Sequence, residues 1–125
     1  MFKVNDDNSI YVTRGDFVML DITAEQDGSP YEFKVGDVIR FTIYEKKDAS
    51  KVIYTQEVPV EANGYNVMLY IPGDHTKIGD TISKPVDYWY EVELVTTLGT
   101  RTIIGYDEEG AKIFRLFPES VQSAE

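Results

Sequence analysis

Apolar and polar residues alternate along the last third of the chain in three short runs. The runs cover residues 88–94, 102–106 and 112–117, and each is rich in aromatic and β-branched side chains. Because alternate side chains of a strand point to opposite faces, such runs are typical of successive antiparallel strands when turn residues separate them. The pattern predicts an all-β domain.

The same alternation predicts which side chains of the other strands point inward. Apolar residues recur with a period of two in the runs 18–22, 39–43 and 67–71. The predicted inward residues are Val18, Leu20, Ile22, Ile39, Phe41, Ile43, Val67, Leu69 and Ile71. In the run 88–94, Tyr88, Tyr90, Val92 and Leu94 share one face, and Trp89 shares the other with Glu91 and Glu93. The single tryptophan is therefore expected to face outward.

Turn residues divide the chain at short intervals that leave room only for strands. Glycine adjoins aspartate, asparagine or proline at positions 15–16, 27–30, 36–37, 63–64 and 72–74. This spacing favours a sandwich or a barrel. Only the segment 72–79 interrupts it. Its proline, a potential capping aspartate and a terminal glycine predict one short helical or 3₁₀ turn near residues 73–79, crossing between sheets.

Composition and charge narrow the possible partners. The 125 residues include no cysteine, so disulfides, thiolate metal sites and cysteine nucleophiles are excluded. Twelve basic residues against 22 acidic ones give a formal net charge of −10, which disfavours nucleic acid and anionic membranes as partners. No apolar run approaches the roughly 18–20 residues that span a bilayer, and the N-terminus lacks a secretory apolar region. We expect the protein to stay in the cytoplasm or to leave it by a route other than secretion.

Candidate catalytic and metal-binding residues all have simpler structural interpretations. His75 is the only histidine, and no Gly-x-Ser-x-Gly motif accompanies it. Glu91 and Glu93 lie about 7 Å apart on one strand face, as any acidic pair two residues apart does. Oxygen ligands at 5–8 and 107–110 lack the spacing of a calcium loop and favour turns. The sequence predicts no catalytic residue, no metal site and no cofactor, and Arg14-Gly15-Asp16 is interpreted as a turn rather than an adhesion signal.

Aromatic residues are the best candidates for a binding surface. The chain has nine tyrosines and one tryptophan. These side chains combine apolar area with a polar tip, which suits a protein partner or a sugar ring, although packing within strands explains most of them. The candidate interface residues are Trp89, Tyr65, Tyr70 and Tyr106.

The order of strands and turns resembles the opening of the immunoglobulin-like domains in tail and baseplate proteins of phages that infect Gram-positive bacteria. The resemblance lies in the segment 9–20 with its Arg14-Gly15-Asp16 turn, the 27–30 turn, and the segment 33–44. It continues through 67–71, the 74–76 connector, 88–94 and the last hairpin. It implies an immunoglobulin-like antiparallel sandwich of about seven to nine strands across residues 9–118. Residues 1–8 and 119–125 are expected to be flexible ends.

The resemblance also implies a function. It suggests a non-enzymatic structural or adaptor protein that contacts other virion or tail proteins, or a second copy of itself. Such a protein would be found in the virion after assembly in the bacterial cytoplasm, and in the cytoplasm of a lysogen. Related domains continue into a receptor-binding portion, whereas this chain ends soon after Pro118. The alternative is a carbohydrate-binding module that stacks exposed aromatics on cell-surface glycans, with a calcium ion near Asp107 and Glu109.

Overall fold

The computed structural model describes residues 1–108 and 110–119. These residues form eleven strands and one 3₁₀ turn, η1. In chain order they are β1 (Phe2–Val4), β2 (Ile10–Thr13), β3 (Val18–Ile22), β4 (Glu25–Gln26), β5 (Ser29–Pro30), β6 (Val38–Tyr44), β7 (Val52–Pro59), β8 (Val67–Ile71), η1 (Gly73–Thr76), β9 (Val86–Thr96), β10 (Gly99–Ile104) and β11 (Lys112–Phe117). The expected all-β fold is confirmed.

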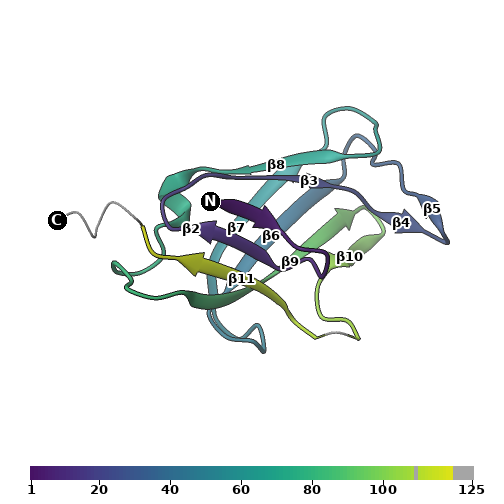
Figure 1. The fold of residues 1–125 in the computed structure, drawn as a ribbon. Coiled ribbons are helices and arrows are strands. Elements are labelled where there is room, and N and C mark those ends of the chain that lie inside the picture. Colours follow the sequence, from purple (N-terminus) through teal and green to yellow (C-terminus); the bar gives the residue numbers. More distant parts are fainter. Residues whose placement is uncertain (109, 120–125) are drawn as a thin grey trace.

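Two sheets of unequal size form the layers of a sandwich (Figure 1). The larger sheet has the strand order β1-β2-β11-β9-β6-β7, and β10 pairs with the end of β9. The smaller sheet is the antiparallel pair β3–β8. A third pair, β4–β5, is a short hairpin whose turn residues Asp27 and Gly28 both have positive φ, 52° and 80°, as a type I′ turn requires.

β9 is a central strand of the larger sheet. β9 pairs with β6 along one edge, and with β11 and then β10 along the other. One pairing is parallel, between β2 and β11, where the sequence predicts only antiparallel strands. The strand count exceeds the expected seven to nine because the structure adds three very short strands, β1, β4 and β5.

The core lies between the two sheets, where the alternation predicts it. All nine residues predicted to point inward from runs 18–22, 39–43 and 67–71 are buried. At the centre, the Phe41 ring lies 5.4 Å from Tyr90 and 6.3 Å from Phe114, measured between ring centroids. Burying a side chain such as Phe41 contributes about 1.5–3 kcal/mol. The core therefore joins strands that are distant in the sequence.

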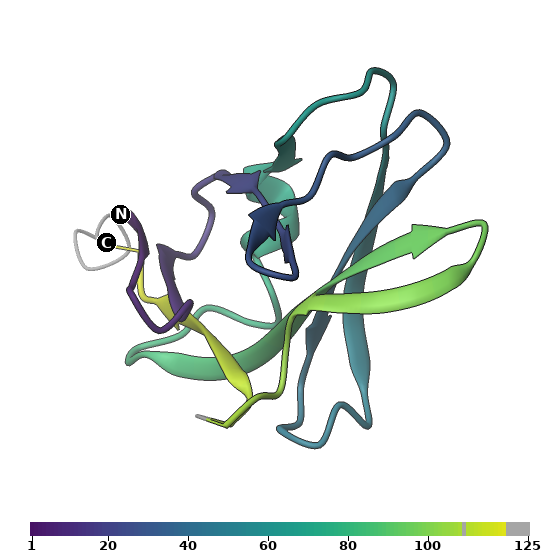
Figure 2. The same ribbon diagram turned by 90° about the vertical axis from the view of Figure 1, so that its right-hand side faces the viewer.

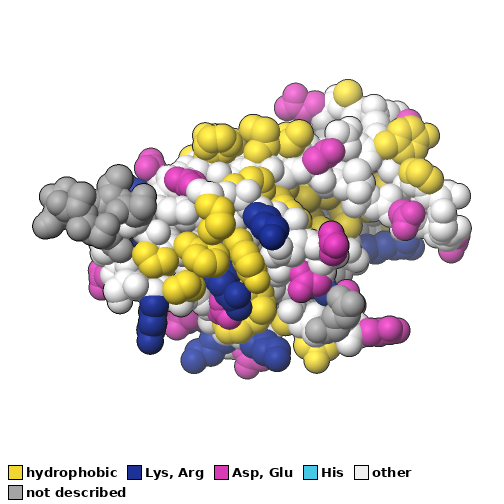
Figure 3. Space-filling view, in the orientation of Figure 1, with side chains coloured by type: hydrophobic (Ala, Val, Ile, Leu, Met, Phe, Trp, Pro, Cys, Tyr) yellow, Lys and Arg dark blue, Asp and Glu magenta, His cyan; other side chains and the backbone are white. Residues whose placement is uncertain are grey.

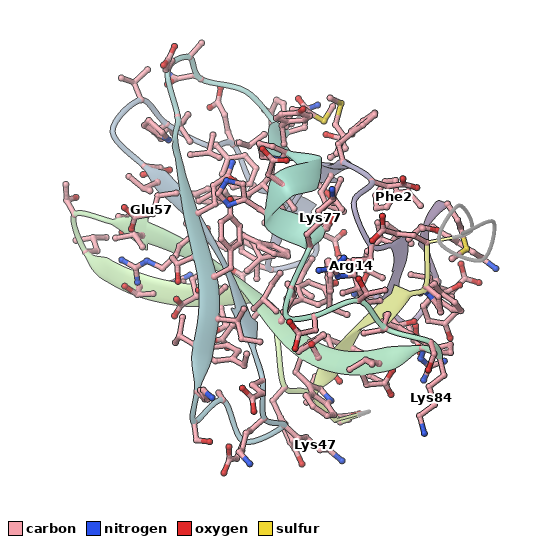
Figure 4. All side chains as sticks on the ribbon, turned by 90° about the vertical axis from the view of Figure 1, so that its left-hand side faces the viewer. Phe2, Arg14, Lys47, Glu57, Lys77 and Lys84 are labelled. Atoms are coloured by element: carbon pink, nitrogen blue, oxygen red, sulfur yellow. The ribbon has the colours of Figure 1, made fainter. Side chains whose placement is uncertain are left out.

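The predicted helical connector is confirmed as η1, which links β8 of the smaller sheet to β9 of the larger one. Thr76 of η1 is fully buried, and its hydroxyl accepts a hydrogen bond from the Gly15 amide at 2.9 Å. The Arg14 guanidinium donates to the carbonyls of Ile78 and Gly79, close to Lys77 (Figure 4). Its side chain is only 10% exposed. Arg14-Gly15-Asp16 is therefore a structural turn that anchors η1.

The two ends of the chain differ in what the structure describes. The segment 1–8 shows no strand pattern in the sequence, yet the structure places β1 there, in antiparallel register with β2. At the other end, the Glu119 carboxylate forms an ion pair with the Arg14 guanidinium at 2.7 Å. The rest of the expected flexible tail, 120–125, lies outside the described residues.

Candidate functional site

The outer face of the β3–β8 pair is apolar, although the inner face of the same pair already supplies the core. In both strands the buried residues alternate with exposed ones. Half-buried antiparallel strands usually present polar side chains to water. Here three of the four exposed positions carry apolar side chains, Met19 on β3, and Met68 and Tyr70 on β8, and the fourth is Asp21 on β3. Except at Asp21, these two strands are therefore apolar on both sides.

Phe17, just before β3, completes a patch that we call the β3–β8 face: Phe17, Met19, Met68 and Tyr70. Their exposed fractions are 56%, 44%, 49% and 46%. Met19 lies opposite Tyr70 in the strand register, and the Phe17 and Tyr70 ring centroids are 5.8 Å apart. Figure 3 shows apolar side chains gathered along this side of the molecule, over β3 and β8. The patch is continuous across both strands.

Hydrogen bonds hold the backbone and the border of this face in place. The Gln56 amide from β7 donates to the Tyr70 carbonyl at 2.6 Å, which ties β8 to the larger sheet. Asp21 lies opposite Met68 and accepts a hydrogen bond from the Asn66 amide at 2.8 Å. The face is thus preformed, with a carboxylate beside its apolar centre.

The chemistry available on this face is burial of apolar area. Methionine and aromatic residues are enriched at the centres of protein interfaces, and methionine adapts its shape to different partners. The Tyr70 hydroxyl is the one polar group among the four side chains that define the face. The arrangement therefore suits binding to another apolar surface.

The outer face of the larger sheet provides a contrast, because ion pairs and hydrogen bonds join several of its outward side chains. Arg115 donates to both carboxylate oxygens of Asp87, at 2.6 and 3.1 Å, and its hydrogen bonds to Asp87 raise the pKa of Arg115. Arg40 pairs with Glu57 and Glu93, at 3.0 and 3.5 Å. This face resembles an ordinary solvated surface over most of its area.

The four aromatic residues predicted as interface candidates fall on three separate surfaces. Tyr70 belongs to the β3–β8 face. Tyr65 is 58% exposed and lines a groove elsewhere. Trp89 and the 78% exposed Tyr106 line one small pocket on the larger sheet. The prediction that Trp89 faces outward with Glu91 and Glu93 is confirmed by the burial of Tyr90, Val92 and Leu94 on the opposite side of β9.

Residues of the β4–β5 hairpin and of the β9–β10 hairpin line the groove that contains Tyr65. Figure 2 shows the two hairpins facing the viewer. The volume of the groove is about 1040 Å³. Tyr31, Leu98 and Arg101 also line it, and Leu98 at the β9–β10 turn is 97% exposed. Its lining mixes polar and apolar side chains, unlike that of the β3–β8 face.

Residues considered for chemistry have structural roles where the structure describes them. His75 is exposed and lies 4.7 Å from Tyr54, between ring centroids. Asp107 and Gly110 form a turn with two backbone hydrogen bonds, and Asp107 pairs with Lys112 at 2.9 Å. Glu109 of the calcium alternative lies outside the described residues. Among residues 1–108 and 110–119, no group of three or more potential ligands could hold a metal ion.

Sequence reasoning missed Phe17, Met19 and Met68. The signal was present, because the residues between the predicted inward positions of 18–22 and 67–71 include Met19, Met68 and Tyr70. An apolar residue at an outward position of a strand indicates either a third layer or a contact surface. The structure places no third layer over these strands in the part of the chain that it describes.

Comparison with known proteins finds no family model, no curated protein and no solved structure that matches this chain. No helix in the described part of the chain is both long and apolar enough to cross a membrane. The functional interpretation therefore depends on the geometry of the surfaces described above.

Proposed function

We propose that this chain is a non-enzymatic structural module that works through protein–protein contacts, as an adaptor in the tail or baseplate of a phage or prophage. The observation that carries the proposal is the β3–β8 face. Four large apolar side chains, each between 44% and 56% exposed, lie together on a strand pair whose other side is fully used by the core. The assembly context comes from the resemblance in strand and turn order.

The partner that fits this face is a different protein with an apolar patch and basic residues around it. Asp21 lies at the border of the face, opposite Met68 in the register. The whole chain carries a formal charge of −10, so two copies brought together repel each other. Charge complementarity therefore favours a basic neighbour over a second copy of this chain.

The test compares particle incorporation of the wild-type chain and two variants after prophage induction in the source strain. Met68→Lys places a charge on the β3–β8 face, and because Asp21 lies opposite, the new ammonium gains an opposite charge across the strands. Leu98→Lys makes the same charge change on the exposed β9–β10 turn and is the matched control. Mass spectrometry measures each protein in purified particles and in the soluble lysate.

The expected result is that wild type and Leu98→Lys occur in particles at a fixed ratio to other tail proteins, while Met68→Lys stays in the lysate as a folded protein. Thermal melts of the purified variants establish folding. Wild-type protein found only in the lysate would contradict the virion role. Equal incorporation of all three proteins would instead show that the β3–β8 face does not make the contact.

The groove beside Tyr65 favours a second candidate function, a carbohydrate-binding module. Tyr31 and Tyr65 supply rings on which a sugar can stack, and Arg101 and the neighbouring threonines supply polar groups for its hydroxyls. A glycan array with the wild-type chain and Tyr65→Ala tests it, with and without calcium. Binding that Tyr65→Ala removes would support the glycan function, and no binding to any glycan would exclude it for the arrayed structures.

A further inference from the structure

A small pocket on the outer face of the larger sheet combines aromatic walls with a carboxylate. It has a volume of about 180 Å³ and a lining that is mainly carbon. The side chains that give it its chemistry are Tyr44, Trp89, Glu91 and Tyr106. It lies on the opposite sheet from the β3–β8 face, so the inference below is independent of the proposed function.

Strand register brings the two inner aromatic residues together. Tyr44 at the end of β6 is directly opposite Trp89 on β9, and both point away from the core because their neighbours Ile43 and Tyr90 are buried. Directly opposite residues of an antiparallel pair have Cβ atoms about 4.5–5.5 Å apart. Tyr106, from the loop between β10 and β11, adds a third ring that is 78% exposed. Three aromatic residues from three segments thus line one small space.

Glu91 supplies the negative charge. It follows Trp89 by two residues and so shares its face of β9. Its Oε1 accepts a hydrogen bond of 2.5 Å from the Tyr44 hydroxyl, which fixes the carboxylate beside the rings. Burial, and then this hydrogen bond, raise the pKa of Tyr44 to about 12, so the hydroxyl remains a donor at neutral pH. The loop that carries Tyr106 packs closely here, since a Cβ at Gly105 would lie 3.5 Å from Glu91 Oε2.

Two lysines also line the pocket, but acidic residues balance them. The Lys112 ammonium lies 2.9 Å from Asp107 Oδ1. Lys47 is on the exposed β6–β7 turn, at the far end of the molecule from η1 (Figure 4), and Asp48 is its neighbour in the lining. With Glu91 added, the local charge favours a cation over an anion.

We propose that this pocket binds a quaternary ammonium group, such as the trimethylammonium of a choline headgroup or of trimethyllysine. Aromatic faces attract cations through their quadrupoles, and the attraction is strongest for tryptophan. A primary ammonium donates up to three hydrogen bonds, and a lining that is mainly carbon offers few acceptors for them. A trimethylammonium group needs none, so its methyl groups contact the rings while Glu91 balances its charge.

Trp89 is the only tryptophan of the chain, so its fluorescence reports directly on the pocket. The purified chain is titrated with choline chloride at constant ionic strength, and in parallel with 3,3-dimethylbutan-1-ol, the uncharged isostere of choline. We expect a saturable change with choline and binding of the isostere weaker by about two- to fivefold or more. Equal binding of the two compounds, or no saturable change with choline up to about 50 mM, would overturn the proposal.

Variants locate the binding. Glu91→Gln keeps an acceptor for Tyr44 but removes the charge, and Tyr106→Ala removes a ring that is largely exposed, so neither change opens the core. Each is expected to weaken choline binding by about two- to fivefold. Tyr65→Ala, on the groove surface, is the matched control and should bind as the wild type does. Unchanged affinity in both pocket variants would place binding elsewhere and contradict the proposal.

Two further ligands distinguish the sources of the group. Phosphocholine adds the phosphate of a headgroup, and Nε-trimethyllysine amide adds a peptide backbone. Tighter binding of phosphocholine than of choline would indicate a headgroup-type ligand, and tighter binding of trimethyllysine amide would indicate a modified protein. If neither of these two ligands nor choline binds, the pocket proposal is contradicted. The proposal that the β3–β8 face binds a protein partner would not be affected.

Discussion

At Gly73 a side chain would collide with the backbone. A Cβ built there would lie 2.2 Å from the Gly15 carbonyl oxygen, because η1 packs directly on the turn between β2 and β3. We expect Gly73→Ala to lower the free energy of unfolding by about 1–3 kcal/mol, since the backbone must shift to accept the methyl group. Urea denaturation measures the loss.

Gly64→Ala is the matched control for this prediction. No atom lies within 4 Å of a Cβ built at Gly64. The control should change the free energy of unfolding little, or raise it by up to about 1 kcal/mol through the unfolded state. Similar values for both variants would mean that the close approach of η1 to Gly15 does not determine stability.

The raised pKa of Tyr44 predicts that the protein loses stability at alkaline pH. Its pKa is about 12 in the folded protein against 10.0 for an ordinary tyrosine, so the folded state holds its proton more tightly than the unfolded state does. The contribution of the Tyr44 proton to the free energy of unfolding is therefore fully present below pH 10 and is lost as pH rises from 10 to 12. Tyr44→Phe should flatten the fall of Tm across that range. Tyr106→Phe, at a largely exposed ring, is the control, and an unchanged slope in Tyr44→Phe would contradict the prediction.

At the scale of elements, the buried hydroxyl of Thr76 binds η1 to the turn between β2 and β3. The Thr76 hydroxyl accepts from the Gly15 amide at 2.9 Å and donates toward the Asp16 or Gly73 carbonyl, at 2.9 and 3.0 Å. Thr76→Val keeps the shape but leaves the Gly15 amide without this acceptor, so we expect a loss of about 1–3 kcal/mol in the free energy of unfolding. Thr55→Val on the exposed side of β7 is the control. Equal stability of the two variants would rule out this role for Thr76.

Elements with strict alternation could be predicted from the sequence, and elements created by pairing could not. β3, β6 and β8 each bury one face, so their inward residues stand out in the pattern. β1 has three exposed residues and becomes a strand only because β2 offers it an edge. The residues of β7 are exposed or half-buried throughout, as at the edge of a sheet, so they show no strongly apolar face in the sequence. The local sequence pattern cannot reveal a strand that forms only because a neighbouring strand pairs with it.

The candidate surfaces also divide into features that local alternation predicts and features that depend on strand pairing. The outward position of Trp89 could be predicted, because apolar and acidic residues alternate along the adjoining residues 90–94 of β9. The pocket around it depends on the register that places Tyr44 opposite Trp89 and on the loop that brings Tyr106 close, and neither is visible in local sequence. The β3–β8 face could be found in part, since Met19 and Met68 occupy outward positions of predicted strands.

At the scale of the whole molecule, the two outer faces of the sandwich differ in chemistry. The larger sheet presents ion pairs, with one aromatic pocket among them. The smaller sheet presents apolar side chains and one carboxylate, that of Asp21, on a chain whose net charge is −10. A protein that is strongly acidic overall and apolar on one preformed face is suited to binding one oriented partner.

Site-specific photocrosslinking tests this claim most directly. A photoreactive phenylalanine analogue is placed at position 68, on the β3–β8 face, and separately at the control position 98, on the exposed β9–β10 turn. Both proteins are produced and irradiated in the source strain during prophage induction. The account predicts that position 68 forms one discrete adduct with a different protein, identified by mass spectrometry as a tail component, and that position 98 does not. No adduct at position 68 above that at position 98, or an adduct only with a second copy of this chain, would contradict it.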